Sequence, residues 1–188
     1  MNGGRERFYA ERDRRTAAYG VAAERLEAPV RIAVSDAAAS SRPGQALALA
    51  LVNMAARIHR RVELEVPAAP LLARSLVPAD DLATACADTA MAIDPFIGLD
   101  LRRDGWGKDH VPSVGVGPGT RSPCHYYVGA DAWSATLDVE SHLVTEHAGT
   151  LLGGGLAAAL GAAALVRSLF GERPVRRRVS LWGFRDRG

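Results

Sequence analysis

The sequence predicts an α/β fold built around a mostly parallel sheet, and three adjacent segments lead to this prediction. A short β-branched run at residues 30–35 is followed by an apolar helix at residues 45–61, and a second strand at residues 62–66 comes directly after it. A strand, a helix and a strand within about forty residues form the βαβ unit of a parallel sheet, whose crossover is nearly always right-handed. We therefore predict a Rossmann-like three-layer sandwich, with helices on both faces of the central sheet.

The part before the first strand is predicted to be helical. Residues 5–26 are rich in charge and carry apolar side chains at helical spacing, although Gly20 can divide them into two helices. We assign residues 1–28 to an N-terminal arginine-rich helix and residues 29–188 to a single Rossmann-like domain. A chain of 188 residues with 48% hydrophobic content is long enough for one such core.

The later elements are predicted from turn signals and apolar patterns. Pro78 opens a helix with Asp80 and Asp81 in its first turn, where carboxylates are favoured by the helix dipole, and Asp94 followed by a proline ends it. Further along, we expect four short strands, a long helix and a last strand, at residues 96–99, 111–116, 126–128, 133–139, 143–170 and 177–182 respectively.

Composition excludes several classes of function. The formal net charge of +2 is too small to indicate nucleic-acid binding. Cys86 and Cys124 are the only cysteines and stand outside any CxxC motif, so this chain alone has neither a disulfide framework nor a structural zinc site. Residues 1–15 are charged throughout and contain no secretory signal. These features favour a cytoplasmic protein.

One uncharged stretch, residues 148–166, is long enough to raise the question of a membrane span. We interpret it as a packing helix, because glycines and alanines outnumber its strongly apolar side chains. Small residues recur every fourth position, at Gly149, Gly153, Ala157 and Gly161, which lets another backbone approach one helix face closely. Such a groove suits a sheet or a second subunit.

Four segments together follow the pattern of a known family. They are the arginine-rich RERFYAERDRR at residues 5–15, the first strand VRIAVS, the crossover helix with its following strand VELEV, and the Ala/Gly-rich helix at residues 149–171. In these segments the chain resembles the ThiF/MoeB/HesA family, the bacterial relatives of ubiquitin-activating enzymes. The resemblance implies an adenylation-type domain whose late glycine-rich helix packs at a dimer interface.

The chain departs from that family where ATP would bind. Adenylating members carry GxGxxG after the first strand, because glycine lets backbone amides approach phosphates at a helix N-terminus. Here residues 35–45 read SDAAASSRPGQ, in which Gly44 is the only glycine. Where family members place an acidic residue for the ribose, residues 66–70 read VPAAP, and Glu65 within the strand is a poor substitute. The zinc-binding CxxC pairs are missing as well.

The resemblance therefore implies the inactive half of a two-part activating enzyme. Its function would be that of a non-catalytic, pseudo-adenylation partner domain of a ThiF-like adenylyltransferase that acts on a ubiquitin-like or sulfur-carrier protein. The partner would be an active adenylating subunit or domain, or a second copy in a homodimer. This chain would hold no cofactor alone, and ATP and Mg²⁺ would belong to the partner's site. Whether the chain is free-standing or part of a longer protein stays open.

Within that resemblance, an arginine of the N-terminal helix can reach the partner's ATP phosphates in trans. Arg12 is the first candidate for this role, followed by Arg14 and Arg15. The alternative is that these arginines form a charged, solvated helix face.

Other chemistry is weighed against plain structural roles. His142, Glu146 and His147 form an HxxxEH pattern that is conceivable as the metal site of a hydrolase, or simply a polar helix start. The glycines of GVGPGT at residues 115–120 are interpreted as a rigid turn, since no helix follows to bind phosphate. A free-standing enzyme, either this metal-dependent hydrolase or an atypical nucleotide-dependent transferase, is the alternative to the partner hypothesis. A homo-oligomeric structural protein is a third possibility.

Overall fold

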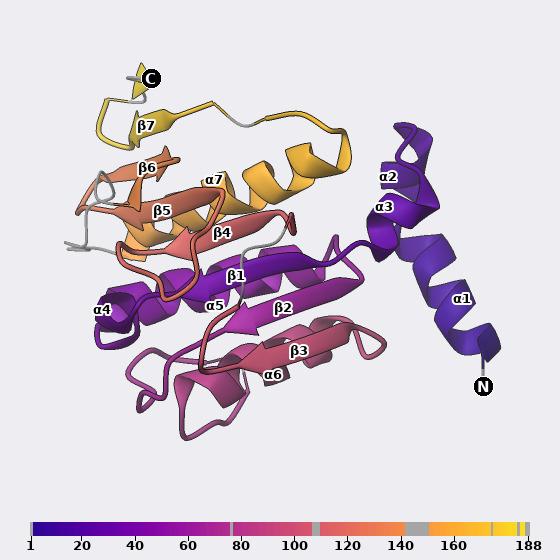
Figure 1. Cartoon of the computed structure of the whole chain (residues 1–188), viewed down its shortest axis with the longest axis horizontal. Helices are drawn as coiled ribbons and strands as arrows, with labels where there is room; N and C mark the ends of the chain where they lie inside the picture. The colour runs from indigo at the N-terminus through magenta and orange to yellow at the C-terminus, as the bar shows by residue number, and fades with distance from the viewer. Residues whose placement is uncertain are drawn as a thin grey trace.

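The structure, a computed structural model, describes residues 2–75, 77–106, 110–141, 151–173, 175–183 and 185–186 (Figure 1). The helices are α1 (Asn2–Arg12), α2 (Arg14–Ala18), α3 (Ala23–Glu27), α4 (Asp36–Ala39), α5 (Arg42–Ala56), α6 (Leu82–Ile93) and α7 (Leu151–Leu169). The strands are β1 (Val30–Val34), β2 (Arg61–Glu65), β3 (Gly98–Arg102), β4 (Ser113–Val116), β5 (Tyr126–Ala130), β6 (Ser134–Asp138), β7 (Arg177–Ser180) and β8 (Arg185–Asp186).

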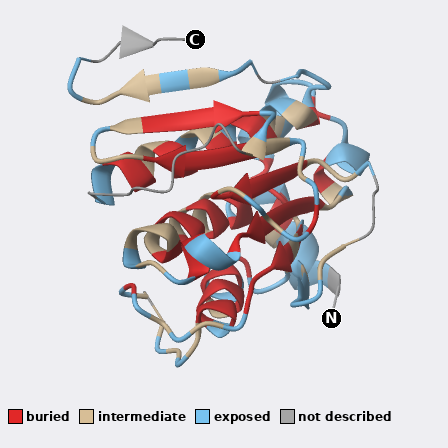
Figure 2. Cartoon of the chain, turned by 60° about the vertical axis from the view of Figure 1, so that its left-hand side comes forward, coloured by how far each residue is buried: buried red, intermediate tan, exposed pale blue. Residues whose placement is uncertain are grey.

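All the strands belong to one sheet, in the order β3-β2-β1-β4-β5-β6-β7-β8. The pairs from β3 to β5 are parallel, and β6, β7 and β8 extend the sheet in antiparallel pairs. In the central register Ile32 pairs with Leu64 on one side and with Val114 on the other. β1, β4 and most of β5 are buried (Figure 2), as expected where parallel strands are covered on both faces. The predicted Rossmann-like α/β fold with a mostly parallel sheet is confirmed.

The helix layer consists of α5 in the middle, flanked by α6 and α7. The small residues of α7 pack inward: a Cβ built on Gly161 would lie 3.2–3.3 Å from side-chain carbons of Leu51, Val114 and Val128. Gly149 lies outside the described residues, and the described part of the predicted groove accommodates the chain's own sheet and α5. Among the described helices, α7 alone has the length and apolar composition of a membrane span.

The layers differ from the prediction in one respect, because α5, α6 and α7 all lie on the same face of the sheet (Figure 1). The opposite face meets the long connection between β3 and β4, where Trp106 lies between two strand arginines. Its ring centroid is 4.5 Å from the guanidinium of Arg31 and 4.0 Å from that of Arg102. Among the residues described between β3 and β4, 103–106 and 110–112, none is helical.

Two helices are shorter than predicted. α6 begins at Leu82 rather than at Pro78, because Asp81 is extended and caps the helix by accepting a hydrogen bond from the Thr84 N–H at 2.9 Å. α5 ends at Ala56, before the predicted residue 61. The predicted break at Gly20 is confirmed by its φ of +81°. A second break lies at Asp13, between α1 and α2, so that the N-terminal segment forms three helices.

Candidate functional site

The carboxyl end of β1, where an adenylating relative would hold phosphate, is occupied by the short helix α4. Ser35 is the N-cap residue of α4, and its Oγ accepts a hydrogen bond from the Ala38 N–H at 3.1 Å. Ser41 then caps α5 in the same way, accepting from the Gly44 N–H at 3.1 Å. The first-turn amide of α5 that the cap satisfies is no longer free for an anion.

The chain packs α4 directly against the first turn of α5. A Cβ built on Gly44 would overlap the Ala38 carbonyl oxygen and lie 2.7 Å from the Ala38 Cα. The single glycine of this segment therefore serves close backbone packing. Where the glycine loop of an active enzyme leaves room for phosphate, this chain has the backbone of α4.

The Gln45 side chain connects the loop after β2 to α4 by hydrogen bonds. Its side chain is fully buried, and its amide nitrogen donates to the carbonyl oxygens of Ala39 (2.7 Å) and Pro70 (2.8 Å). Its amide oxygen accepts from the backbone N–H groups of Leu72 (2.6 Å) and Ala73 (3.0 Å). Four hydrogen bonds thus hold one side chain between α4 and the loop, which removes the freedom that a nucleotide-binding loop needs.

Glu65, the residue closest to the position of the ribose-binding acid, is 1% exposed. One carboxylate oxygen accepts a hydrogen bond from the Ser122 N–H at 3.1 Å, and the other has no hydrogen-bond partner among the described residues. The Ser122 hydroxyl also bonds with the backbone of Trp106, so the β3–β4 connection covers Glu65. The carboxylate therefore faces the protein interior.

The packing at Gly44 gives a direct test. We expect Gly44→Ala to lower the free energy of unfolding by about 2 kcal/mol, because the added methyl group has to displace backbone atoms. Gly155→Ala is the matched control, since Gly155 also lies in a helix but has nothing within 4 Å of its Cβ position. The control should gain about 0.5–1 kcal/mol from the lower backbone entropy of alanine. Urea unfolding followed by circular dichroism measures both, and stabilisation by both changes would contradict the packing described.

Arg12, the first arginine predicted to act in trans, is bound within its own chain. Its guanidinium contacts the carboxylates of Asp94 and Asp13, both at 2.6 Å, and donates to the carbonyl oxygens of Ala56 (3.3 Å) and Ile58 (3.2 Å). The Arg12 side chain is only 13% exposed. In this structure Arg12 therefore docks α1 onto the segment that leads into β2.

A second layer of contacts strengthens the same docking. Asp13 also binds Arg60 at 2.8 Å, and Arg60 binds Glu27 at 2.6 Å. The Tyr9 ring is 3% exposed and has the Arg60 guanidinium 4.4 Å from its centroid, while its hydroxyl donates to the Phe96 carbonyl oxygen. Burial raises the Tyr9 pKa above its ordinary value, and the Asp94 carboxylate acts in the same direction.

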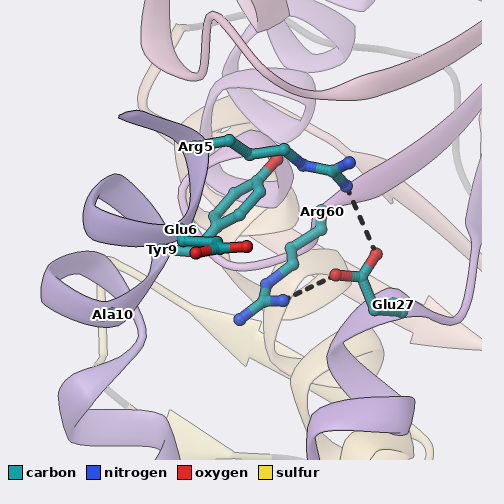
Figure 3. A pocket seen from close by; sticks show the side chains of 6 residues that line it. All are labelled: Arg5, Glu6, Tyr9, Ala10, Glu27 and Arg60. Carbon is teal, nitrogen blue, oxygen red and sulfur yellow. Dashed lines mark hydrogen bonds and ion pairs between the residues drawn. The ribbon is translucent and has the colours of Figure 1, made fainter. Parts of the chain in front are cut away.

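An open pocket of about 550 Å³ lies beside this docked helix. Figure 3 shows Glu27 bridging the guanidinium groups of Arg5 and Arg60 at its edge, with Tyr9 between the two arginines. Because Glu27 and Glu6 together balance the charges of Arg5 and Arg60, the pocket lacks the net positive charge of an anion site.

Arg14 and Arg15 are placed differently from Arg12. Both are exposed on α2, and neither makes an ion pair or a side-chain hydrogen bond with another described residue. α1, α2 and α3 lie at the amino ends of the parallel strands, away from α4 at the opposite end (Figure 1). The structure separates the three predicted arginines into one that is bound within the chain and two whose side chains are exposed and bind no other described residue.

His59 is a site residue that the sequence analysis missed. It is fully buried next to the docked helix, and neither ring nitrogen has a hydrogen-bond partner among the described residues. Burial lowers the pKa of His59 to about 4, and the positive charge of Arg12 adds to the shift. Asp94 was interpreted only as a helix end, because nothing in the local pattern points to its distant partner Arg12.

The alternative chemistries gain no support from the described residues. No group of three metal-ligating side chains occurs among them, and the predicted metal residues His142, Glu146 and His147 lie outside the described residues. Burial raises the pKa of the Cys124 thiol to about 11, so the thiol stays protonated at neutral pH. The neighbouring His125 forms a 2.8 Å hydrogen bond with the Ser113 hydroxyl instead. Gly117 and Gly119 have positive φ angles, as expected of a turn.

Comparisons with known proteins agree with the fold. A sequence profile described as the BilD N-terminal domain matches residues 29–181. No curated protein matches the sequence. Among solved structures, PaaA has a TM-score of 0.56 and 14% identity, over 87% of this chain and 73% of that chain.

A second solved relative is MccB of E. coli, a microcin C7 biosynthetic enzyme. Its structure with ATP has a TM-score of 0.55 and its structure with MccA-N7isoASN one of 0.60, each at 11% identity over 87% of this chain. The chain spans 64% of the MccB chain in both, which is less than two thirds. At these identities the likeness establishes the fold alone.

Proposed function

Since the chain belongs to the BilD N-terminal domain family, we propose that it is a non-catalytic, pseudo-adenylation partner domain of a ThiF-like adenylyltransferase. The active partner is an adenylating subunit or domain, and its substrate is a ubiquitin-like or sulfur-carrier protein. ATP and Mg²⁺ bind in the partner's site. The two cysteines are free, which is consistent with the cytoplasmic location that forms part of the proposal.

The observation that carries the proposal is the filled phosphate position. Active members of this fold need free amides and open space at the first turn of the helix after β1. Here the Ser41 side chain caps one of those amides, and the Ala38 backbone lies against Gly44. A triphosphate could bind only if α4 left this position and the Gln45 hydrogen bonds broke.

The structural neighbours support the part of the proposal that gives the chain an adenylating partner. MccB, which shares the fold, has structures with ATP and with MccA, so this fold accommodates a nucleotide and a second molecule, MccA, in that protein. We infer that the partner of the present chain keeps the nucleotide site that this chain lacks.

We propose that Arg14 and Arg15 contribute positive charge to the partner's ATP phosphates, because they are exposed and unpaired in the described part of the chain. Arg12 is the third candidate, and its role in trans requires that it leave Asp94. An arginine supplied in trans stabilises the charge that develops on transferring phosphates.

The first test is calorimetric titration of the chain with Mg·ATP. We expect no binding heat from the chain alone, because the phosphate position is filled. Tight ATP binding by the chain alone would overturn the proposal.

The second test uses the reconstituted complex with its adenylating partner. Arg14→Ala with Arg15→Ala should lower adenylation at least tenfold in the complex if the two arginines act on phosphate. Arg57→Ala, which removes an exposed arginine of the helix layer, is the matched control and should have no effect. Equal loss in both variants would rule out a specific role for α2.

A further inference from the structure

The β3 strand forms one edge of the sheet. It pairs with β2 on one side, and the backbone groups on its other side make no hydrogen bond to β2. The Gly98 N–H donates to the Arg60 carbonyl oxygen, and the Arg102 carbonyl oxygen accepts from the Val66 N–H. The even-numbered residues of β3 therefore point their backbone groups toward β2. Because these directions alternate along a strand, Leu99 and Leu101 point theirs away from the sheet.

This edge is also exposed. Four of the five β3 residues are exposed, including Leu101 at 38%, and Met91 of α6 (47%) and Phe96 before β3 (39%) are large apolar side chains exposed nearby. Exposed edge strands are templates for pairing with another strand. The side chains of β3 determine which strand can pair with this edge.

We propose that β3 pairs antiparallel with β3 of a second copy of this chain, about a two-fold axis at Leu101. In this register Leu101 lies opposite Leu101 of the second copy, and Leu99 lies opposite Arg103. The Leu101 pair uses the outward-pointing backbone groups, so it forms a hydrogen-bonded pair across the axis. Arg103 follows β3, and its carbonyl oxygen accepts a hydrogen bond from the Arg121 side chain of its own copy. The two sheets then become one continuous sheet.

Charge selects this register. Asp100 lies opposite Arg102 of the second copy, and the symmetry repeats the pair, so that two cross-strand ion pairs flank the axis. In the alternative register about Asp100, two aspartates face each other, which is unfavourable. The carboxylate of Asp100 and the guanidinium of Arg102 are about half exposed and only 3.8 Å apart within one copy, so both charges are available at the edge.

This pairing goes beyond the proposed function, because it uses the β3 edge and requires no adenylating partner. The arginines proposed to act in trans lie on α2, and the filled phosphate position lies at α4. ATP titration therefore tests the proposed function without testing this pairing, and a measurement of dimerisation tests the pairing without testing the proposed function.

The experiment is sedimentation velocity over a concentration series, with two single variants and their mixture. Asp100→Arg places arginines opposite Arg102, and Arg102→Asp places aspartates opposite Asp100, so each variant repels itself. Each should weaken dimerisation at least tenfold. In a 1:1 mixture, both arginines of the first variant face aspartates of the second across the axis, which should restore the dimer in mixed form.

Circular dichroism of each variant checks that it remains folded, because Arg102 also stacks on Trp106. Leu101→Pro supplies an independent variant: it removes an outward N–H and no hydrogen bond to β2, and it should also give a monomer. A wild-type chain that stays monomeric at its highest soluble concentration would overturn the proposal. So would a dimer that persists in the single variants, or a mixture of folded variants that fails to associate.

Discussion

Asp94→Asn is expected to release α1 from the domain and to raise amide hydrogen exchange in residues 2–12 roughly 100-fold. Asp94 is fully buried and binds the Arg12 guanidinium at 2.6 Å. Without Asp94 the Arg12 guanidinium keeps only the Asp13 carboxylate, which it shares with Arg60. Breaking a buried ion pair in this way costs about 3 kcal/mol. Undocking α1 returns Arg12 to water, and an isolated helix of 11 residues is not stable alone. The penalty should therefore appear as local opening.

Two further variants separate this mechanism from a general loss of stability. Glu172→Gln removes the partner of Arg167 at the surface, where both side chains are about half exposed, so it should cost less than about 1 kcal/mol and leave exchange in α1 unchanged. Arg12→Met added to Asp94→Asn removes the guanidinium that has lost its buried partner, and it should recover part of the protection. If Asp94→Asn exchanged no faster than Glu172→Gln, the docking role of Arg12 would be refuted.

Stability is expected to fall by about 3 kcal/mol between pH 6.5 and pH 4 because of His59 alone. Burial holds the pKa of His59 near 4 in the folded chain, against an ordinary value of 6.5. Above pH 6.5 the ring is neutral in both states and the full stability is present. Below it, the unfolded chain takes up a proton that the folded chain refuses, so stability decreases until the pH reaches the folded pKa.

Urea unfolding of the wild type and of His59→Leu across this pH range isolates the contribution of His59, because the carboxylates titrate in both proteins. Neither ring nitrogen of His59 has a hydrogen-bond partner among the described residues, so leucine breaks no such bond. The difference between the two curves should grow as pH falls. Parallel curves would show that His59 takes up its proton without penalty. His125→Gln, at an exposed site, serves as the control.

The predictions for Asp94 and for His59 concern one place in the fold, the contact between α1 and the rest of the domain. Arg12, Asp13, Asp94 and Arg60 form connected ion pairs there, with His59 buried beside them. If Arg14 and Arg15 act on a partner, the stability of this contact sets where α2 is presented. Variants at Asp94 should then change adenylation in the complex indirectly, through the position of α2.

The sequence by itself determined the type and order of the main elements, although it predicted neither α4 nor β8, and it showed that the glycine loop is absent. β-branched runs, the apolar helix and the proline-bounded segments are local signals, and the absence of glycines from residues 35–43 is visible in the letters alone. The family resemblance came from the same local patterns.

Only the tertiary structure showed which charged side chains are buried and which residues they bind. The sequence suggested that Arg12 is solvated or extends toward a partner. Its fully buried carboxylate partner, Asp94, is 82 positions away in the sequence, and no periodicity connects the two. The same holds for Gly44, whose role depends on how α4 folds back on α5, and for α5, α6 and α7, which pack together on one face of the sheet. Local sequence encodes hydrogen bonding within an element, whereas burial and ion pairing depend on which distant elements meet.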